Sequence, residues 1–207
     1  MISVVIPVHD HADFVADAVA SVLGQSVAPA EVLVVDDGST DDSAARALAG
    51  GARVVRGAHR GTSHALNRGV AETTQPLVAF LDADDVWMPD KLERQLAVLG
   101  DREAVFGWVE EFSALDVRCR TLPGLFKGTM LVRRTALERV GRFDESLDKG
   151  DFVDWFVRAR EAGMTHVMLD RIVMRRRIHA ANLARHRLPD HRDYLRILKA
   201  ALDRRRA

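Results

Sequence analysis

Short runs of β-branched and aliphatic residues alternate, over the first hundred residues, with stretches in which apolar residues recur every three or four positions. The apolar runs that predict buried strands lie at 3–8, 31–35, 53–55 and 77–81. The stretches 14–24 and 62–71 between them have the spacing of helices. This alternation predicts an α/β fold, in which helices flank a central, mostly parallel sheet.

The pattern is weaker in the second half of the chain. Strands are predicted at 104–112 and 129–133, and a helix at 151–162. Near the end, apolar side chains share one face of a predicted helix, with Arg and Lys on the other face; they are Tyr194, Ile197, Leu198, Ala201 and Leu202. We therefore expect a basic amphipathic helix within residues 184–207.

Charge is balanced over the whole chain but not along it. The 207 residues include 30 Lys and Arg and 30 Asp and Glu, which gives no electrostatic reason to expect a nucleic-acid partner. Residues 171–207, however, hold 12 basic and three acidic residues. Such a basic segment can contact the acidic body, a second subunit, a phosphate group or an anionic membrane.

The chain contains a single cysteine, Cys119, so no disulfide can form within it. Its first residues carry neither the basic start nor the long apolar run of a signal peptide. We expect a cytoplasmic protein, with peripheral membrane attachment through the basic helix left open.

Two of the predicted strands end in clusters of carboxylates. Asp82, Asp84 and Asp85 repel one another unless a cation joins them, and oxygen ligands suit Mg²⁺ or Mn²⁺; the alternative is an acidic turn beside a helix start. Asp36 and Asp37 could accept hydrogen bonds from a base or a ribose, or could form an Asx turn. Because ligands of open α/β sheets bind beyond the carboxyl ends of the strands, we expect both clusters to face one crevice.

Several sequence motifs resemble, in order and spacing, those of the family 2 glycosyltransferases of GT-A fold. The motifs are SVVIPVHD (3–10), AVASVLGQ (18–25), VVDDGSTD (34–41), GTSHALNRG (61–69), FLDADD (80–85), VGRFDE (140–145), GDFVDW (150–155) and RIHAAN (177–182). The resemblance covers residues 2 to about 183. It implies a single domain over 1–183, with a nucleotide-sugar-binding half (1–100) and an acceptor half (101–183).

The resemblance also implies a role for each matching residue. The residues expected to bind the donor are Pro7, Asp10, Asp36, Asp37, Gly61, Asn67, Asp82 and Asp84, with Asp82 near the ribose or the sugar. Asp84 and His179 are the implied metal ligands, and Asp151 is the implied general base. Asp154, one helical turn later, is an alternative base or a partner of Asp151. Trp87 is a candidate for stacking on a sugar or, alternatively, a core residue.

This chemistry predicts an inverting, metal-dependent transfer of a sugar from a nucleoside-diphosphate sugar, with UDP the expected nucleotide. The acceptor stays open: a saccharide, a lipid-linked sugar, a metabolite or a peptide. Three positions depart from the family pattern: Asp10 replaces a common asparagine, Leu66 an arginine and Gly150 a glutamate. These departures keep a second hypothesis open, namely a catalytically silent module that binds a sugar nucleotide or a partner. A nucleotidyltransferase is disfavoured because the first loop lacks a glycine-rich phosphate motif.

Overall fold

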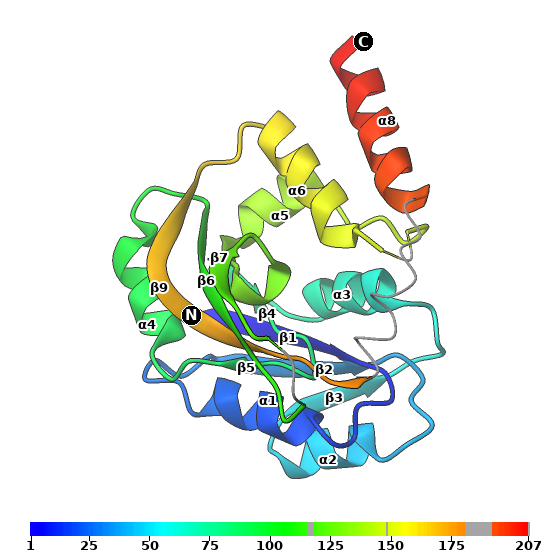
Figure 1. Cartoon of the computed structure of the whole chain (residues 1–207), viewed down its shortest axis with the longest axis vertical. Helices are drawn as coiled ribbons and strands as arrows, with labels where there is room; N and C mark the ends of the chain where they lie inside the picture. The colour runs from blue at the N-terminus through cyan, green and yellow to red at the C-terminus, as the bar shows by residue number, and fades with distance from the viewer. Residues whose placement is uncertain (116–117, 148, 181–191, 207) are drawn as a thin grey trace.

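The computed structural model describes residues 1–115, 118–147, 149–180 and 192–206. Within this part of the chain, nine strands form one mixed sheet in the order β3-β2-β1-β4-β8-β6-β9-β5, and β7 pairs with β6 (Figure 1). The strands are β1 (Ile2–Val8), β2 (Glu31–Asp36), β3 (Arg53–Arg56), β4 (Leu77–Phe80), β5 (Val86–Trp87), β6 (Ala104–Phe112), β7 (Thr121–Gly124), β8 (Leu131–Arg133) and β9 (His166–Arg177).

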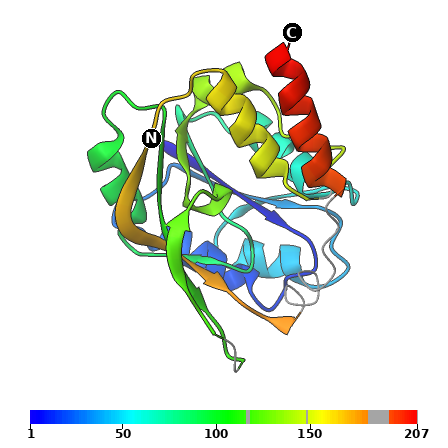
Figure 2. The ribbon, with the colours of Figure 1, turned by 45° about the horizontal axis from the view of Figure 1, so that its top comes forward.

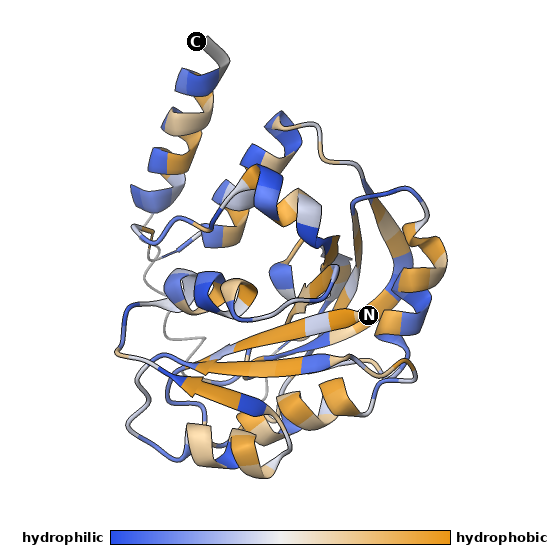
Figure 3. Cartoon of the chain, turned by 180° about the vertical axis from the view of Figure 1, so that it is seen from behind, coloured by the Kyte–Doolittle hydropathy of each residue, from blue (hydrophilic) through white to orange (hydrophobic). Residues whose placement is uncertain are grey.

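The first four strands are parallel neighbours, as the sequence predicts. Val4 and Ile6 of β1 pack into the hydrophobic core on one side of the sheet, and Val5 packs into the core on the other. A strand with both faces buried needs apolar residues at successive positions, which explains the continuous hydrophobic runs. Figure 3 shows these strands mostly in the colour of hydrophobic residues.

Helices cover both faces of the sheet (Figure 1). One core lies beneath α1 (Val15–Leu23), α2 (Ser43–Ala49) and α4 (Lys91–Leu99). The other lies beneath α3 (Thr62–Ala71), α5 (Arg134–Val140) and α6 (Asp151–Glu161). With helices on both faces, the sheet presents its strand ends to solvent, and loops at the carboxyl ends of the parallel strands can build a site.

The second half of the sheet is mixed. β8 runs antiparallel to both β4 and β6, whereas β6 and β9 are parallel. The strand predicted at 129–133 is shorter than expected, because Lys127–Thr129 form a 3₁₀ turn (η1) and β8 begins at Leu131. β9 was not predicted: it ends in Arg175, Arg176 and Arg177, which do not read as a strand.

The predicted basic helix is present as α8 (Arg192–Arg206), and residues 184–191 lie outside the described part of the chain. α8 lies beside α6 (Figure 2), and its buried residues Ile197 and Ala201 line one cavity together with Val153 and Val157 of α6. Leu195, Leu198 and Leu202 are exposed. Among the described helices, none is long and apolar enough to cross a membrane.

Candidate active site

A cavity of about 320 Å³ opens at the carboxyl ends of β1, β2 and β4. It brings together residues from the two acidic clusters, the start of α3, η1 and the segment after β9. The lining residues are Pro7, Val8, His9, His11, Asp37, His59, Gly61, Thr62, Ala65, Asp82, Ala83, Asp84, Lys127 and His179. Both acidic clusters thus face one crevice, as predicted.

Three candidate metal ligands converge at one side of this cavity. Ligand atoms of His11, Asp84 and His179 all lie within 4.8 Å of one another. His179 Nε2 is 3.1 Å from Asp84 Oδ2, although the two residues are 95 positions apart. The predicted pair of Asp84 and His179 is therefore brought together, and His11 joins it. Two imidazoles and a carboxylate are a donor set that fits a divalent transition metal such as Mn²⁺.

The remaining acids of the second cluster lie in contrasting surroundings. Asp85 is buried, and its Oδ1 accepts a hydrogen bond from the Arg177 backbone N–H at 2.9 Å. Burial and the charges of Asp84 and Asp82 raise its pKa well above the ordinary value. Burial also raises the pKa of Asp82, against the opposing effect of Lys127, whose Nζ lies 3.3 Å from Asp82 Oδ1. Two of the three neighbouring carboxyl groups thus have raised pKa values.

Asp151, the predicted base, is the first residue of α6. Its Oδ2 is buried and accepts no hydrogen bond from the residues that the structure describes. The ammonium of Lys127 lies 3.9 Å from this oxygen. Asp154, the alternative base, instead accepts a 2.8 Å hydrogen bond from Arg158 Nε. The structure therefore distinguishes the two carboxylates, leaving Asp151 the one with an uncommitted oxygen.

Asp37 organises the other end of the cavity. Its two carboxylate oxygens accept hydrogen bonds from the backbone N–H groups of Arg60 (2.9 Å) and Gly61 (2.8 Å). The imidazoles of His9 and His59 stack above it, with ring centroids 4.0 Å apart. Gly61 has φ +95°, a conformation that favours glycine, and it precedes the first turn of α3. Its positive φ turns the chain so that the start of α3 points into the cavity.

Three predicted donor residues hold the loops and are not among those lining the cavity. Asp10 (φ +52°) accepts the Thr40 backbone N–H at 2.7 Å, and this hydrogen bond lowers its pKa. Asp36 is fully buried and accepts hydrogen bonds from Ser39 N and Arg56 Nε, both at 2.9 Å.

Asn67 is likewise buried and ties α3 to the loop after α5. Its side chain donates to Phe143 O and accepts from Phe143 N, both at 2.9 Å. Asp10, Asp36 and Asn67 thus position the neighbouring residues that do line the cavity.

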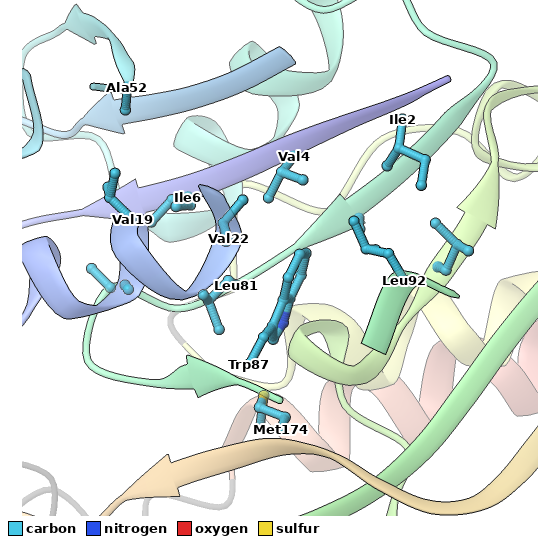
Figure 4. Close-up of a cluster of buried hydrophobic side chains, with 14 of the residues drawn as sticks. Ile2, Val4, Ile6, Val19, Val22, Ala52, Leu81, Trp87, Leu92 and Met174 are labelled. Carbon is cyan, nitrogen blue, oxygen red and sulfur yellow. The ribbon is translucent and has the colours of Figure 1, made fainter. Parts of the chain in front are cut away.

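The expectation that Trp87 contacts a sugar does not hold in this structure. Its side chain is 4% exposed, lies within the hydrophobic core and donates a 2.8 Å hydrogen bond to Gly128 O (Figure 4). Because β5 pairs with β9, Trp87 is turned into the sheet and away from the cavity. Trp87 is the core residue that the alternative interpretation describes.

The departures from the family pattern also have structural explanations. Leu66 is fully buried in the core beneath α3, where an arginine would need a partner. Gly150 has φ +78°, and a side chain there would meet Ile197 of α8, whose Cδ1 lies 2.9 Å from the position of a Cβ. Asp193 accepts a 3.1 Å hydrogen bond from the Lys149 backbone N–H. The first turns of α8 therefore pack on the residue that precedes Asp151.

Sequence reasoning missed several lining residues. His11 follows the first strand and could have been found from that position, since the carboxyl end of this strand borders the crevice. Lys127 ends the segment 110–127, which the sequence offers as a candidate for completing the acceptor site, but no motif singles out this lysine 43 residues after Asp84. His9 and His59 lie in loops beside predicted residues, but nothing in the sequence pairs them.

Comparison with known proteins identifies the family of this chain. A family model described as glycosyl transferase family 2 matches residues 3–134. An uncharacterised glycosyltransferase of Rickettsia prowazekii is 27% identical over 93% of this chain and 70% of its own length. The succinoglycan biosynthesis protein ExoU of Rhizobium meliloti is 31% identical over 81% of this chain and 59% of its own length. This chain thus spans about three fifths of the length of ExoU.

The fold is shared with solved structures of much lower identity. A crystal structure of residues 1–349 of TarS from S. aureus, in complex with UDP-GlcNAc, has a TM-score of 0.74 at 17% identity, covering 86% of this chain and 59% of that one. The likeness supports the GT-A type of α/β fold. Since the family model covers more than half of the chain, including both acidic clusters at the cavity, this chain belongs to glycosyltransferase family 2.

Proposed function

We propose that this chain transfers a sugar, with inversion at the anomeric carbon, from a UDP-sugar to a hydroxyl acceptor, in a reaction that requires Mn²⁺. The observation that carries the proposal is the arrangement of charged groups at one cavity. His11, Asp84 and His179 gather at one side, and the pair of Lys127 and Asp151 stands near Asp82.

The nucleotide base is assigned to the end of the cavity formed by His9, His59 and Asp37, where flat rings and hydrogen-bonding groups meet. Thr62 and Ala65, in the first turn of α3, line the cavity. This turn is suited to the diphosphate, because backbone N–H groups and the helix dipole favour an anion there. The TarS structures in complex with UDP and UDP-GlcNAc support UDP as the nucleotide.

His11, Asp84 and His179 would hold the metal. Two nitrogen ligands favour Mn²⁺ over Mg²⁺, which takes oxygen ligands almost exclusively. The bound ion would supply positive charge to the leaving diphosphate. The family relationship and the donor set both support this assignment.

Asp151 takes the proton of the acceptor hydroxyl as the acceptor oxygen attacks the anomeric carbon and the bond from that carbon to the phosphate oxygen breaks. Retention would require a second displacement by an enzyme nucleophile. Asp154 is paired with Arg158 and turned to the loop after α5, so it is not placed for that role. With Asp84 assigned to the metal, Asp82 paired with Lys127 and Asp37 bonded to backbone N–H groups, Asp151 is left for the proton transfer, which supports a single displacement and hence inversion.

For the acceptor side, we propose a contact between α8 and an anionic membrane surface. Residues 192–206 include six basic and two acidic residues, and the exposed leucines of α8 continue the apolar face that packs on α6. Basic residues beside an apolar helix face complement an anionic bilayer. A lipid-linked acceptor would then lie near Asp151, because α8 packs against Gly150.

Flotation with phosphatidylglycerol vesicles tests this contact, with phosphatidylcholine vesicles as the control. We expect the protein to bind the anionic vesicles and this binding to weaken as the salt concentration rises. The double variant Leu195→Ser, Leu198→Ser should also bind more weakly. Equal recovery with both kinds of vesicle would contradict the contact, and a concentration-dependent dimer in their absence would assign the face to a second copy.

The enzymatic proposal is tested by incubating the protein with single UDP-sugars, Mn²⁺ and no acceptor, and measuring released UDP. Slow hydrolysis of at least one UDP-sugar is expected in wild type, and its loss in Asp84→Ala and in Asp151→Asn. UDP binding without any turnover of a broad panel, with or without acceptor extracts, would favour the silent module.

A further inference from the structure

Lys127 lines the cavity and contacts both Asp82 and Asp151. Its Nζ is 3.3 Å from Asp82 Oδ1 and 3.9 Å from Asp151 Oδ2, and its side chain is 15% exposed. Burial alone would lower its pKa, but the carboxylates of Asp82 and Asp151 raise it above the ordinary value. The ammonium is therefore a fixed positive charge between two carboxylates.

The backbone that carries Lys127 is firmly held. Gly128 O accepts the indole N–H of Trp87 at 2.8 Å, and Thr129 O accepts Gln95 Nε2 at 2.7 Å. A side chain at Gly128 would meet the Met174 sulfur at 2.5 Å. The buried Trp87 thus has a function near the site: it anchors the turn from which Lys127 extends.

Lys127 is the cation that contacts the carboxylate of Asp151 within the described residues. The buried Oδ2 of Asp151 accepts no hydrogen bond from these residues, and Lys127 contacts both this oxygen and Asp82. Burial and a neighbouring negative charge both favour the protonated form of a carboxyl group, which cannot act as a base. A nearby cation counters both effects.

We propose that Lys127 is a positioning residue for the general base: its ammonium keeps the Asp151 carboxylate ionised and directed toward the reacting hydroxyl. The proposal rests on the base role proposed above for Asp151. When Asp151 takes the acceptor proton and becomes neutral, Lys127 retains Asp82 as its partner, so no unpaired cation is left in the site.

The first test does not depend on turnover. Carbon-13 NMR of Asp-labelled protein follows the titration of Asp151, with its signal assigned by loss in Asp151→Asn. We expect Lys127→Met to raise the Asp151 midpoint by about one pH unit or more, and Lys127→Arg to shift it by less than half as much. A midpoint that does not move in folded Lys127→Met would overturn the proposal.

The second test uses hydrolysis of the UDP-sugar that wild type accepts. Lys127→Met should lower kcat about 100-fold at neutral pH, move the acidic limb of the pH profile upward and leave KM within about threefold. Lys127→Arg should recover part of kcat. If both variants lost the same fraction of kcat and the acidic limb of the pH profile did not move, Lys127 would have only a structural role.

Lys199→Met is the control for the loss of a lysine charge. Lys199 is exposed on α8 and is not among the cavity residues. Its removal should change neither the Asp151 midpoint nor the rate. Absence of hydrolysis in wild type would refute the proposed function but not the role of Lys127. The NMR midpoint of Asp151 tests that role separately.

Discussion

Two acidic loops, one after β2 and one after β4, look alike in sequence, but their carboxylates have different partners in the structure. Asp36 and Asp37, after β2, have their carboxylate oxygens occupied by Arg56 and by the backbone N–H groups of Ser39, Arg60 and Gly61. Asp82, Asp84 and Asp85, after β4, lie close to one another, with histidines, Lys127 and the Arg177 backbone N–H as partners, and two of them have raised pKa values.

The carboxylates of the first loop accept hydrogen bonds from the protein, whereas those of the second lie close together beside the candidate metal ligands. Hydrogen bonds to a carboxylate stabilise its charged form, whereas clustered carboxylates destabilise one another. The role of each loop therefore depends on the partners of its carboxylates more than on residue type. The first loop shapes the cavity, and the second provides the groups that act in the reaction. The variants below test this difference, in order of decreasing effect.

The largest effect is expected for Asp151→Asn. Removing the base should lower the rate of sugar transfer or donor hydrolysis by about 10²- to 10⁴-fold, while UDP affinity in the presence of Mn²⁺ stays unchanged. Steady-state UDP release and calorimetry measure the two quantities. Asp154→Asn is the control, because Asp154 is already paired with Arg158; a larger loss in that variant would move the base role to Asp154.

Asp84→Ala should reduce the Mn²⁺-dependent affinity for UDP by about 100-fold, since even residues that only orient metal ligands contribute about 10- to 100-fold. Calorimetric titration of UDP with Mn²⁺ measures the change. Full affinity in the folded variant would mean that the second loop does not hold the metal.

His11→Ala should weaken Mn²⁺ binding less, by about tenfold, because Asp84 and His179 keep their mutual contact at 3.1 Å. Manganese binding can be followed by electron paramagnetic resonance of free Mn²⁺. His64→Ala is the control, because His64 contacts Glu145 and is not among the cavity residues. Identical Mn²⁺ affinities for wild type and His11→Ala would remove His11 from the ligand set.

The smallest effect on binding is expected for Asp36→Asn, in the first loop. The buried amide would turn a donor toward Arg56 and lose this hydrogen bond, which costs about 1–3 kcal/mol of unfolding free energy. Urea denaturation measures the cost, and UDP affinity should change by less than about threefold. Loss of UDP binding without loss of stability would reverse the roles of the two loops.

Much of the first half could be predicted from sequence, because local pattern and tertiary environment agree there. The run 62–71 has the exact bounds of α3, and the apolar runs match β1 to β4 within two residues. Asp84 and His179 followed from the family resemblance, and their contact is present.

The remainder depends on contacts that no local pattern encodes. β9 ends in three arginines whose neighbours include Glu110 and Asp85, so its strand character comes from pairing with β6. Trp87 follows an acidic cluster, but pairing between β5 and β9 turns it into the core. Lys127 enters the site only because a 3₁₀ turn brings it against Asp82 and Asp151.

Calorimetric titration of UDP into the wild-type protein, with Mn²⁺ and then with a chelator, tests the central claim most directly, with GDP as the comparison nucleotide. The account predicts that UDP binds only with Mn²⁺, that GDP binds more weakly, and that Asp84→Ala removes the metal dependence. UDP binding of equal strength in chelator, or no binding of either nucleotide to the folded protein, would contradict it.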